Sequence, residues 1–177
     1  MQIYVDADGF PRAAKEILVR AALRLCVPVV FVANKPVRQE PSLLISSLLV
    51  PEGPDIADDR IVESAEPGDL VITTDIPLAD RVVSTGAFAL NPRGKLYTEE
   101  NIKDRLAVRD LLSELRDGGL MTGGPPAFGK KDCHAFADQL DRFLIRRLKE
   151  KITEDKERRR DGDNCEWNGD GSGAGGG

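Results

Sequence analysis

The chain has 177 residues, 41% of them hydrophobic and 5% aromatic, which predicts one domain with a mainly aliphatic core. Its formal net charge of -5 argues against a globally basic nucleic-acid-binding protein, so a nucleic-acid partner would have to bind through a local basic patch or through metal ions. The three cysteines are far apart and form no CxxC motif, and no leader or membrane-length apolar run is present, so we expect a cytoplasmic protein with no membrane partner.

The chain opens with a short apolar strand that leads into Asp6, Ala7 and Asp8. In extended backbone, side chains two residues apart point to the same face, so Asp6 and Asp8 would leave the strand together if the strand continues that far. Two close carboxylates raise each other's pKa unless a cation lies between them. A divalent metal ion is one explanation for the pair. The other is that Asp8 caps a helix that starts near Pro11.

Strands and helices alternate through the next eighty residues. Apolar spacing predicts a helix over residues 11–25, followed by a β-branched strand over residues 27–33 that is typical of a buried parallel sheet. Further elements are expected as a third strand near the end of residues 43–50, a short helix after Asp55, a strand over 69–75, a helix over 77–84 and a strand over 87–90. This alternation predicts an α/β fold with an open, mostly parallel sheet of about five short strands flanked by helices.

The pattern becomes helical after the last of these strands. Residues 98–116 and 132–151 predict two C-terminal helices, joined by a loop rich in glycine and proline that lacks a phosphate-binding motif. Cys26 is expected in the core and His134 on a helix surface. Residues 1–151 would then form a single α/β domain, and residues 152–177, charged and then glycine-rich, a disordered tail.

Aspartates gather at the ends of the predicted strands. Asp6 and Asp75 end two of them, while Asp55, Asp58 and Asp59 surround the first turn of a helix, where the helix dipole also favours negative charge. In open parallel sheets, ligands bind beyond the carboxyl ends of the strands where strand order reverses. If the strand ending at Asp75 pairs with the first strand, these carboxylates converge. An oxygen-only set of this kind suits Mg²⁺ or Mn²⁺, and it typically serves phosphodiester chemistry.

Five segments carry a family resemblance: VDADGFPRAAKEILVRAA, VPVVFVAN, GPDIADDRIVE, GDLVITTDIPLADRVVSTGAFALNPRGKLYTEENI and LRDGGLMTGGPPAF. Together they resemble the YaiI/YqxD family of uncharacterised bacterial proteins, from residue 1 to about residue 148. That family is similar to PIN-domain and NYN-type nucleases, which implies a PIN-like fold and an acidic metal pocket. The positions that match its acidic pattern are Asp6, Asp8, Asp55, Asp58 and Asp75.

The chain departs from the family pattern in two places. Gly9 and Phe10 stand where an Ala-Cys pair is usual, so a thiol-dependent role is not open to this protein there. Asp59 and Asp80 occupy positions that need not be acidic in the family, and we rank them below the other five aspartates.

The leading hypothesis is a nuclease-like protein that uses Mg²⁺ or Mn²⁺ to act on RNA or single-stranded nucleic acid. The expected catalytic residues are Asp6, Asp58 and Asp75. The expected metal ligands are Asp6, Asp8, Asp55, Asp58 and Asp75. The expected substrate contacts are Asn34, Thr73 and Arg93. Arg109 and Arg116 are further candidates for phosphate contact, although ordinary solvation explains them equally well.

Two other functions fit the same residues. A HAD-like phosphohydrolase would use Asp6 as its nucleophile and Asp8 as its general acid, but no late GDxxxD motif supports it. A non-catalytic module would bind metal or RNA without turnover. The sequence pattern makes no prediction of the oligomeric state.

Overall fold

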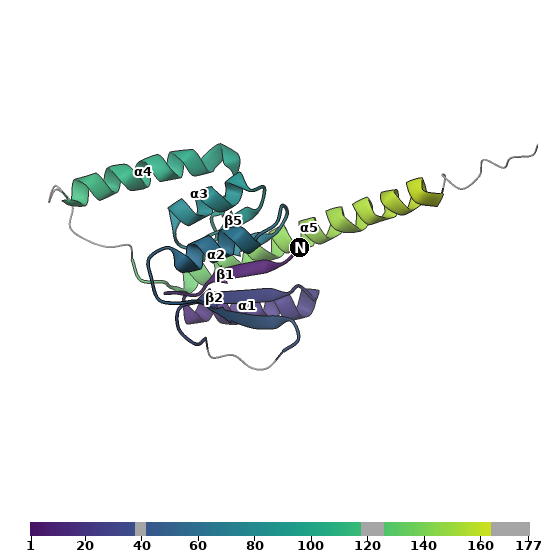
Figure 1. The fold of residues 1–177 in the computed structure, drawn as a ribbon, viewed down its shortest axis with the longest axis horizontal. Coiled ribbons are helices and arrows are strands. Elements are labelled where there is room, and N and C mark those ends of the chain that lie inside the picture. The colour runs from purple at the N-terminus through teal and green to yellow at the C-terminus, as the bar shows by residue number, and fades with distance from the viewer. Residues whose placement is uncertain (38–41, 118–125, 164–177) are drawn as a thin grey trace, which may run out of the picture. The chain divides into compact units, whose positions relative to one another are not determined.

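The computed structural model describes residues 1–37, 42–117 and 126–163. The chain divides into two compact units, Met1–Asp141 and Arg142–Gly177. The first unit holds the sheet and its helices, and the second holds the later part of the last helix (Figure 1).

A six-stranded sheet forms the centre of the first unit. Its strands are β1 (Ile3–Asp6), β2 (Val29–Ala33), β3 (Ile45–Leu49), β4 (Leu70–Ile72), β5 (Phe88–Leu90) and β6 (Leu96–Tyr97). They lie in the order β3-β2-β1-β4-β5-β6, and every pairing is parallel except the antiparallel pairing of β5 with β6. The predicted α/β fold with a mostly parallel sheet is therefore confirmed.

Strand β6 adds one strand to the number expected. It follows a tight turn in which the Asn91 amide donates to the Lys95 carbonyl at 2.8 Å, and Gly94 adopts a left-handed φ of 79°. The strand was not expected, because two residues carry no periodicity that a sequence pattern could reveal.

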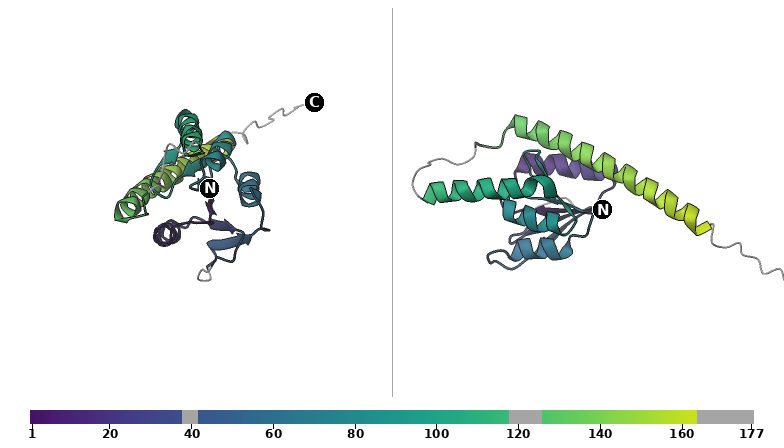
Figure 2. Two further views of the ribbon diagram at one scale, coloured as in Figure 1. Left: turned by 90° about the vertical axis from the view of Figure 1, so that its left-hand side faces the viewer. Right: turned by 90° about the horizontal axis from the view of Figure 1, so that it is seen from above.

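Five helices lie in the part of the chain that the structure describes. They are α1 (Arg12–Leu25), α2 (Ile56–Ser64), α3 (Ile76–Ser84), α4 (Glu99–Asp117) and α5 (Lys130–Asp163). Helices α1 and α2 lie on opposite faces of the sheet (Figure 2). On the α2 side, Tyr4, Val71 and Ala89 of the strands belong to one apolar cluster with Ile61 of α2 and Leu78 of α3. Because strand side chains alternate between faces, Ile3 and Val5 face the α1 side.

Helix α1 ends in an unusual backbone conformation. Cys26 closes the helix at a left-handed φ of 54°, and its side chain is exposed. The prediction that Cys26 lies in the core is wrong, because the residue that ends the helix turns away from the face that packs on the sheet. His134 is exposed, as expected.

Helix α5 is longer than residues 132–151. The expected boundary between domain and tail, at residues 151–152, falls inside this helix. Within the second unit, Glu150 pairs with Arg146 at 3.8 Å and with Arg147 at 2.6 Å, and pairs spaced three or four residues apart support a helix whose surface is mostly charged. Residues 164–177 lie outside the described part of the chain, so their expected disorder stays a prediction. Among the described helices, none has the length and apolar character needed to span a membrane.

Candidate acidic site

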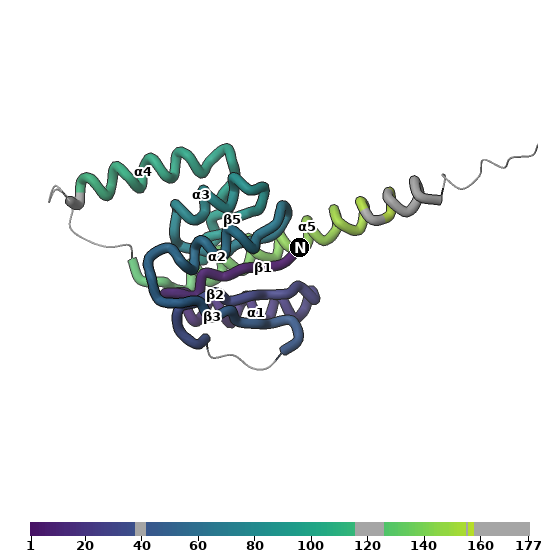
Figure 3. The backbone as a smooth tube through the Cα atoms, viewed as in Figure 1, coloured from purple at the N-terminus to yellow at the C-terminus, as the bar shows by residue number. Residues whose placement is uncertain are grey.

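Strand order reverses between β1 and β4. The chain runs from β1 to β2 and β3 on one side of the first strand (Figure 3), and β4, β5 and β6 follow on the other side. Strands β1 and β4 pair in parallel, with Val5 opposite Ile72. Asp6 at the end of β1 and the Thr73 to Asp75 segment after β4 therefore leave the same edge of the sheet, as predicted.

Asp6 is held by hydrogen bonds to both carboxylate oxygens. The Thr73 hydroxyl donates to Asp6 Oδ2 at 2.9 Å, and the Asp8 backbone amide donates to Oδ1 at 3.3 Å. Burial raises the pKa of Asp6 above its ordinary value, while these two hydrogen bonds oppose the rise and the nearby charges of Asp8 and Asp75 add to it. Asp6 is thus a positioned carboxylate in a partly buried, negatively charged setting.

Thr73 positions Asp6 and cannot contact a substrate. The residue is fully buried, and its hydroxyl accepts from the Asp75 amide at 2.9 Å while donating to Asp6. The expected substrate contact is therefore wrong for Thr73. The hydroxyl instead connects the carboxyl ends of β1 and β4 and directs a proton toward Asp6, which favours the ionised carboxylate.

Three of these aspartates lie close to the start of a helix, but only one of them caps it. Asp75 does cap its helix, because its Oδ1 accepts from the Leu78 amide at 3.0 Å. Asp55 precedes α2 in a left-handed conformation, with φ of 59°, and its side chain makes no capping hydrogen bond. Asp8 lies in an exposed turn beyond the end of β1, and α1 begins after Pro11 without a side-chain cap. Capping therefore explains neither Asp8 nor Asp55.

A cavity of about 570 Å³ opens at this edge of the sheet. It is lined by Asp6, Asp8, Asn34, Pro51, Gly53, Asp55, Ala57, Asp58, Thr74, Asp75, Ile76 and Arg109. All five aspartates that match the family's acidic pattern meet here, together with Asn34. Arg109 reaches the cavity from α4, and it is the residue whose role the sequence pattern could not separate from ordinary solvation.

Asp58 carries the strongest electrostatic signal in this cavity. Its pKa is raised to about 6, first by burial and then by the charges of Asp6, Asp75 and Asp55. Arg81 opposes this rise only weakly, since it forms a 2.6 Å ion pair with the exposed Asp59. The cavity therefore holds several negative charges that Arg81, the nearby cation, does not neutralise.

The donor set fits a hard divalent cation in its chemistry. Within the ranges that the structure describes, no three His, Cys, Asp or Glu side chains are placed so that they could hold one ion together. Mg²⁺, however, usually keeps several waters and takes only one or two protein carboxylates along with substrate phosphates. Carboxylate and amide oxygens suit Mg²⁺ or Mn²⁺. The repulsion between carboxylates that helps to raise the pKa of Asp58 would decrease if a cation were bound among them.

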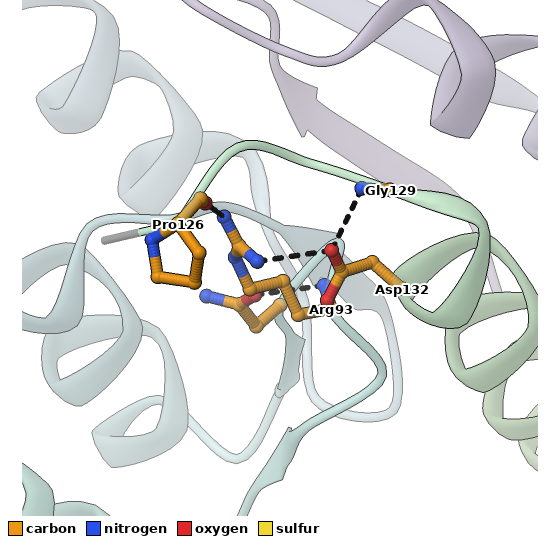
Figure 4. A network of polar contacts seen from close by, with 5 residues as sticks. Arg93, Pro126, Gly129 and Asp132 are labelled. Atoms are coloured by element: carbon orange, nitrogen blue, oxygen red, sulfur yellow. Dashed lines mark hydrogen bonds and ion pairs between the residues drawn. The ribbon is translucent and has the colours of Figure 1, made fainter.

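Arg93 belongs to a network of polar contacts outside the cavity. Its guanidinium pairs with Asp132 at 3.0 Å and donates to the Pro126 carbonyl, while Asp132 also accepts from the Gly129 amide at 2.9 Å (Figure 4). The Arg93 backbone amide donates to Asn91 Oδ1 at 2.8 Å. Arg93 thereby ties the turn after β5 to the segment that enters α5, and it is not among the cavity-lining residues, so its expected substrate contact stays a prediction.

Comparison with known proteins assigns the family. The sequence model of the YaiI/YqxD family, a group of uncharacterised proteins, matches residues 4–146. The chain belongs to the YaiI/YqxD family. It is 53% identical over 150 residues to a protein of Geobacter metallireducens, which covers 85% of this chain and 97% of the relative.

Two further relatives show the same extent of similarity. A protein of Hahella chejuensis is 53% identical over 149 residues, covering 84% of this chain and 99% of the relative. One of Solidesulfovibrio magneticus is 55% identical over 144 residues, covering 81% of this chain and 96% of the relative. All three carry the name UPF0178 protein, which states no activity. No solved structure matches the chain.

Every cavity-lining residue falls inside the segment that matches the YaiI/YqxD family. The two aspartates ranked below the others lie outside the cavity and form ion pairs. Asp59 pairs with Arg81, and Asp80 pairs with Lys103 at 2.7 Å. Within this YaiI/YqxD segment, these seven aspartates thus separate into five that line the cavity and two that pair with cations outside it.

Proposed function

We propose that this YaiI/YqxD protein is a divalent-metal-dependent nuclease that acts on RNA or other single-stranded nucleic acid. The supporting observation is the convergence of Asp6, Asp58 and Asp75 on one cavity at the point where strand order reverses. Ligand sites of open α/β sheets lie at such points. The raised pKa of Asp58 supports a cation-binding role for the same cluster.

The chain's own residues take distinct roles in this proposal. Asp6, fixed by Thr73, would bind Mg²⁺ or Mn²⁺ directly, while Asp58, Asp75 and the exposed Asp8 and Asp55 would bind the cation through water. A cation bound there would neutralise charge at a phosphodiester and activate water for its hydrolysis. The cavity has the volume of a small-ligand pocket, so it suits one nucleotide of a single strand better than an intact duplex.

A cleavage assay on the full chain tests the proposal. Labelled single-stranded RNA and DNA should be cut in Mg²⁺ or Mn²⁺ and left intact in EDTA. Asp6→Asn and Asp58→Asn should abolish cleavage while a circular dichroism melt shows that both variants are folded. Asp59→Asn, an exposed residue outside the cavity, is the matched control and should keep activity. Cleavage that survives both EDTA and Asp6→Asn would refute the proposal.

A second candidate is a non-catalytic module that binds metal or RNA. The observation that favours it over catalysis is that, among the described residues, no three side chains are placed to hold one ion in a fixed catalytic geometry. Calorimetry would then show Mn²⁺ or RNA binding that Asp6→Asn removes, with no turnover across a broad substrate panel. An aspartyl-phosphate analogue trapped on Asp6 would instead indicate the phosphohydrolase reaction.

A further inference from the structure

Helix α4 brings one basic side chain to an otherwise acidic cavity. Among the described residues that line the cavity, Arg109 is the only one with a positive charge, and five aspartates line the same cavity. Its guanidinium lies 3.1 Å from the carboxylate of the adjacent Asp110, and these side chains are 46% and 56% exposed. Solvent screens such a surface pair strongly, so Asp110 leaves most of the charge of Arg109 open to another anion.

The aspartates of the cavity do not account for Arg109. Within the described chain, no ion pair joins Arg109 to Asp6, Asp58 or the other cavity carboxylates. The cation that does form a close pair beside the cluster is Arg81, and its partner Asp59 lies outside the cavity.

We propose that Arg109 binds a backbone phosphate of the nucleic-acid strand in the cavity and thereby makes the site selective for a phosphodiester chain. This inference rests on the proposed function. Five carboxylates repel a polyanion, and a bound cation offsets that repulsion only where it lies. A guanidinium on the α4 wall supplies a second point of attachment, because its planar fork matches two oxygens of one phosphate. Arg109 is thus a substrate-binding residue and not a metal ligand.

Binding of a single-stranded oligonucleotide to the full chain tests this role without requiring turnover. A fluorescein-labelled DNA 8-mer would be titrated in Mg²⁺ by anisotropy, and its integrity checked on a gel after each titration. Arg109→Gln should weaken binding about tenfold, and Arg109→Lys should recover part of the loss because it restores the charge without the fork. The plot of log affinity against log salt should become shallower by about 0.7, as expected when one phosphate contact to a single strand is lost.

Substitutions of two other arginines serve as controls, one for the loss of net charge and one for the loss of a positive charge elsewhere on α4. Arg20→Gln, on the exposed surface of α1, removes the same net charge away from the cavity, and Arg105→Gln removes a charge one turn earlier on α4. Both should bind the 8-mer as the unmodified chain does. Equal weakening by Arg105→Gln and Arg109→Gln would show a general effect of helix charge and would overturn the assignment.

Neutral methylphosphonate linkages, placed one at a time in the 8-mer, identify the contact itself. One such linkage should weaken binding to the unmodified chain and have no further effect on Arg109→Gln, as expected for two partners of a single contact. If every linkage weakens binding equally in both proteins, the inference is wrong.

The outcomes also separate this inference from the proposed function. If one neutral linkage weakens binding to the unmodified chain but not to Arg109→Gln, and no strand is ever cleaved, the nuclease proposal alone is refuted. If cleavage depends on the metal but Arg109→Gln binds the 8-mer as the unmodified chain does, the role of Arg109 alone is refuted. Circular dichroism of each variant verifies folding.

Discussion

Asp6 depends on a hydroxyl that never reaches solvent. The Thr73 hydroxyl is fully buried and has two partners, the Asp6 carboxylate at 2.9 Å and the Asp75 amide at 2.9 Å. A buried donor or acceptor that loses its partner costs more than the hydrogen bond contributed, because the group has also lost water. The ends of β1 and β4 are therefore coupled through a single oxygen atom.

Removing that oxygen should destabilise the protein. Thr73→Val preserves the shape of the side chain but leaves the Asp75 amide and Asp6 Oδ2 without their partner, so we expect the free energy of unfolding to fall by about 1–3 kcal/mol. Thr73→Ser keeps the hydroxyl and should lose clearly less. Urea denaturation at pH 7 measures both. If Thr73→Val loses no stability, the two hydrogen bonds of the hydroxyl make no contribution.

Asp58 should destabilise the metal-free protein at neutral pH. Its pKa is about 6 in the folded chain against an ordinary 3.8, so the unfolded state ionises first. The resulting penalty is absent below pH 3.8, grows as pH rises toward 6 and is complete above that value. Because Asp58 is only partly buried, solvent screening reduces the effect to about 1–2 kcal/mol.

The charge of Asp58 can be removed to check this penalty. In EDTA, Asp58→Asn should be more stable than the unmodified chain at pH 7.5, and the gain should vanish near pH 4. Asp59→Asn is the control, since Asp59 is exposed and paired with Arg81, and it should show no such gain. A gain that is equal at both pH values would contradict an electrostatic origin.

A cavity residue could be predicted from the sequence where its place at the end of a buried strand fixes where it lies in the sheet. Asp6 and Asp75 follow buried strands directly, so a parallel sheet must bring them to one edge. The roles of Thr73 and Arg93 could not be predicted in this way. Thr73 is directed inward by the geometry at the end of β4, and Arg93 finds Asp132 at a distance of 39 residues along the chain. Neither partner lies within the range of a local pattern.

At the level of elements, strands buried on both faces were predictable because continuous β-branched runs have few other uses. Pairing and length were harder to predict. Strand β6 consists of Leu96 and Tyr97 alone, and it exists because a tight turn returns the chain alongside β5. Helix α5 continues past Lys151 through charged sequence that lacks the apolar periodicity that the prediction required.

The turn between β5 and β6 should be intolerant of any side chain at Gly94. This residue has a φ of 79°, and a Cβ atom built there would lie 2.5 Å from the carbonyl carbon of Ala135 at the start of α5. Gly94→Ala should therefore combine left-handed strain of about 1 kcal/mol with a steric clash of about 1–3 kcal/mol.

Gly9 offers a matched control for that substitution. Its φ is 75°, but a Cβ atom there would meet nothing within 4 Å. Gly9→Ala should lose only the strain part, about 1 kcal/mol, when both variants are compared by urea denaturation. If Gly9→Ala and Gly94→Ala lose equal stability, the close approach of the turn to Ala135 makes no contribution.

In the first unit, the strand order brings together aspartates that lie far apart in the sequence. Strands β2 and β3 lie on one side of β1 and strands β4 to β6 on the other, so the loops after β1 and β4 diverge and leave a cavity between them. Helix α2 and the residue before it contribute Asp58 and Asp55 to that cavity, and α4 contributes Arg109. Sequence reasoning predicted the reversal point and its aspartates, but the reach of α4 depends on packing between helices that no local pattern specifies.

A cation that binds this cavity should stabilise the folded chain in a pH-dependent manner. Mg²⁺ or Mn²⁺ at about 100 times its dissociation constant adds about 2.7 kcal/mol, which corresponds to a rise in Tm of about 5–10 °C for a chain of this size. Protons compete for Asp58, whose pKa is about 6, so the rise measured by calorimetry should be larger at pH 7.5 than at pH 5. Asp6→Asn should abolish the rise, and Asp59→Asn should retain it. A rise of equal size at both pH values, or one that persists in Asp6→Asn, would place the cation outside this cavity.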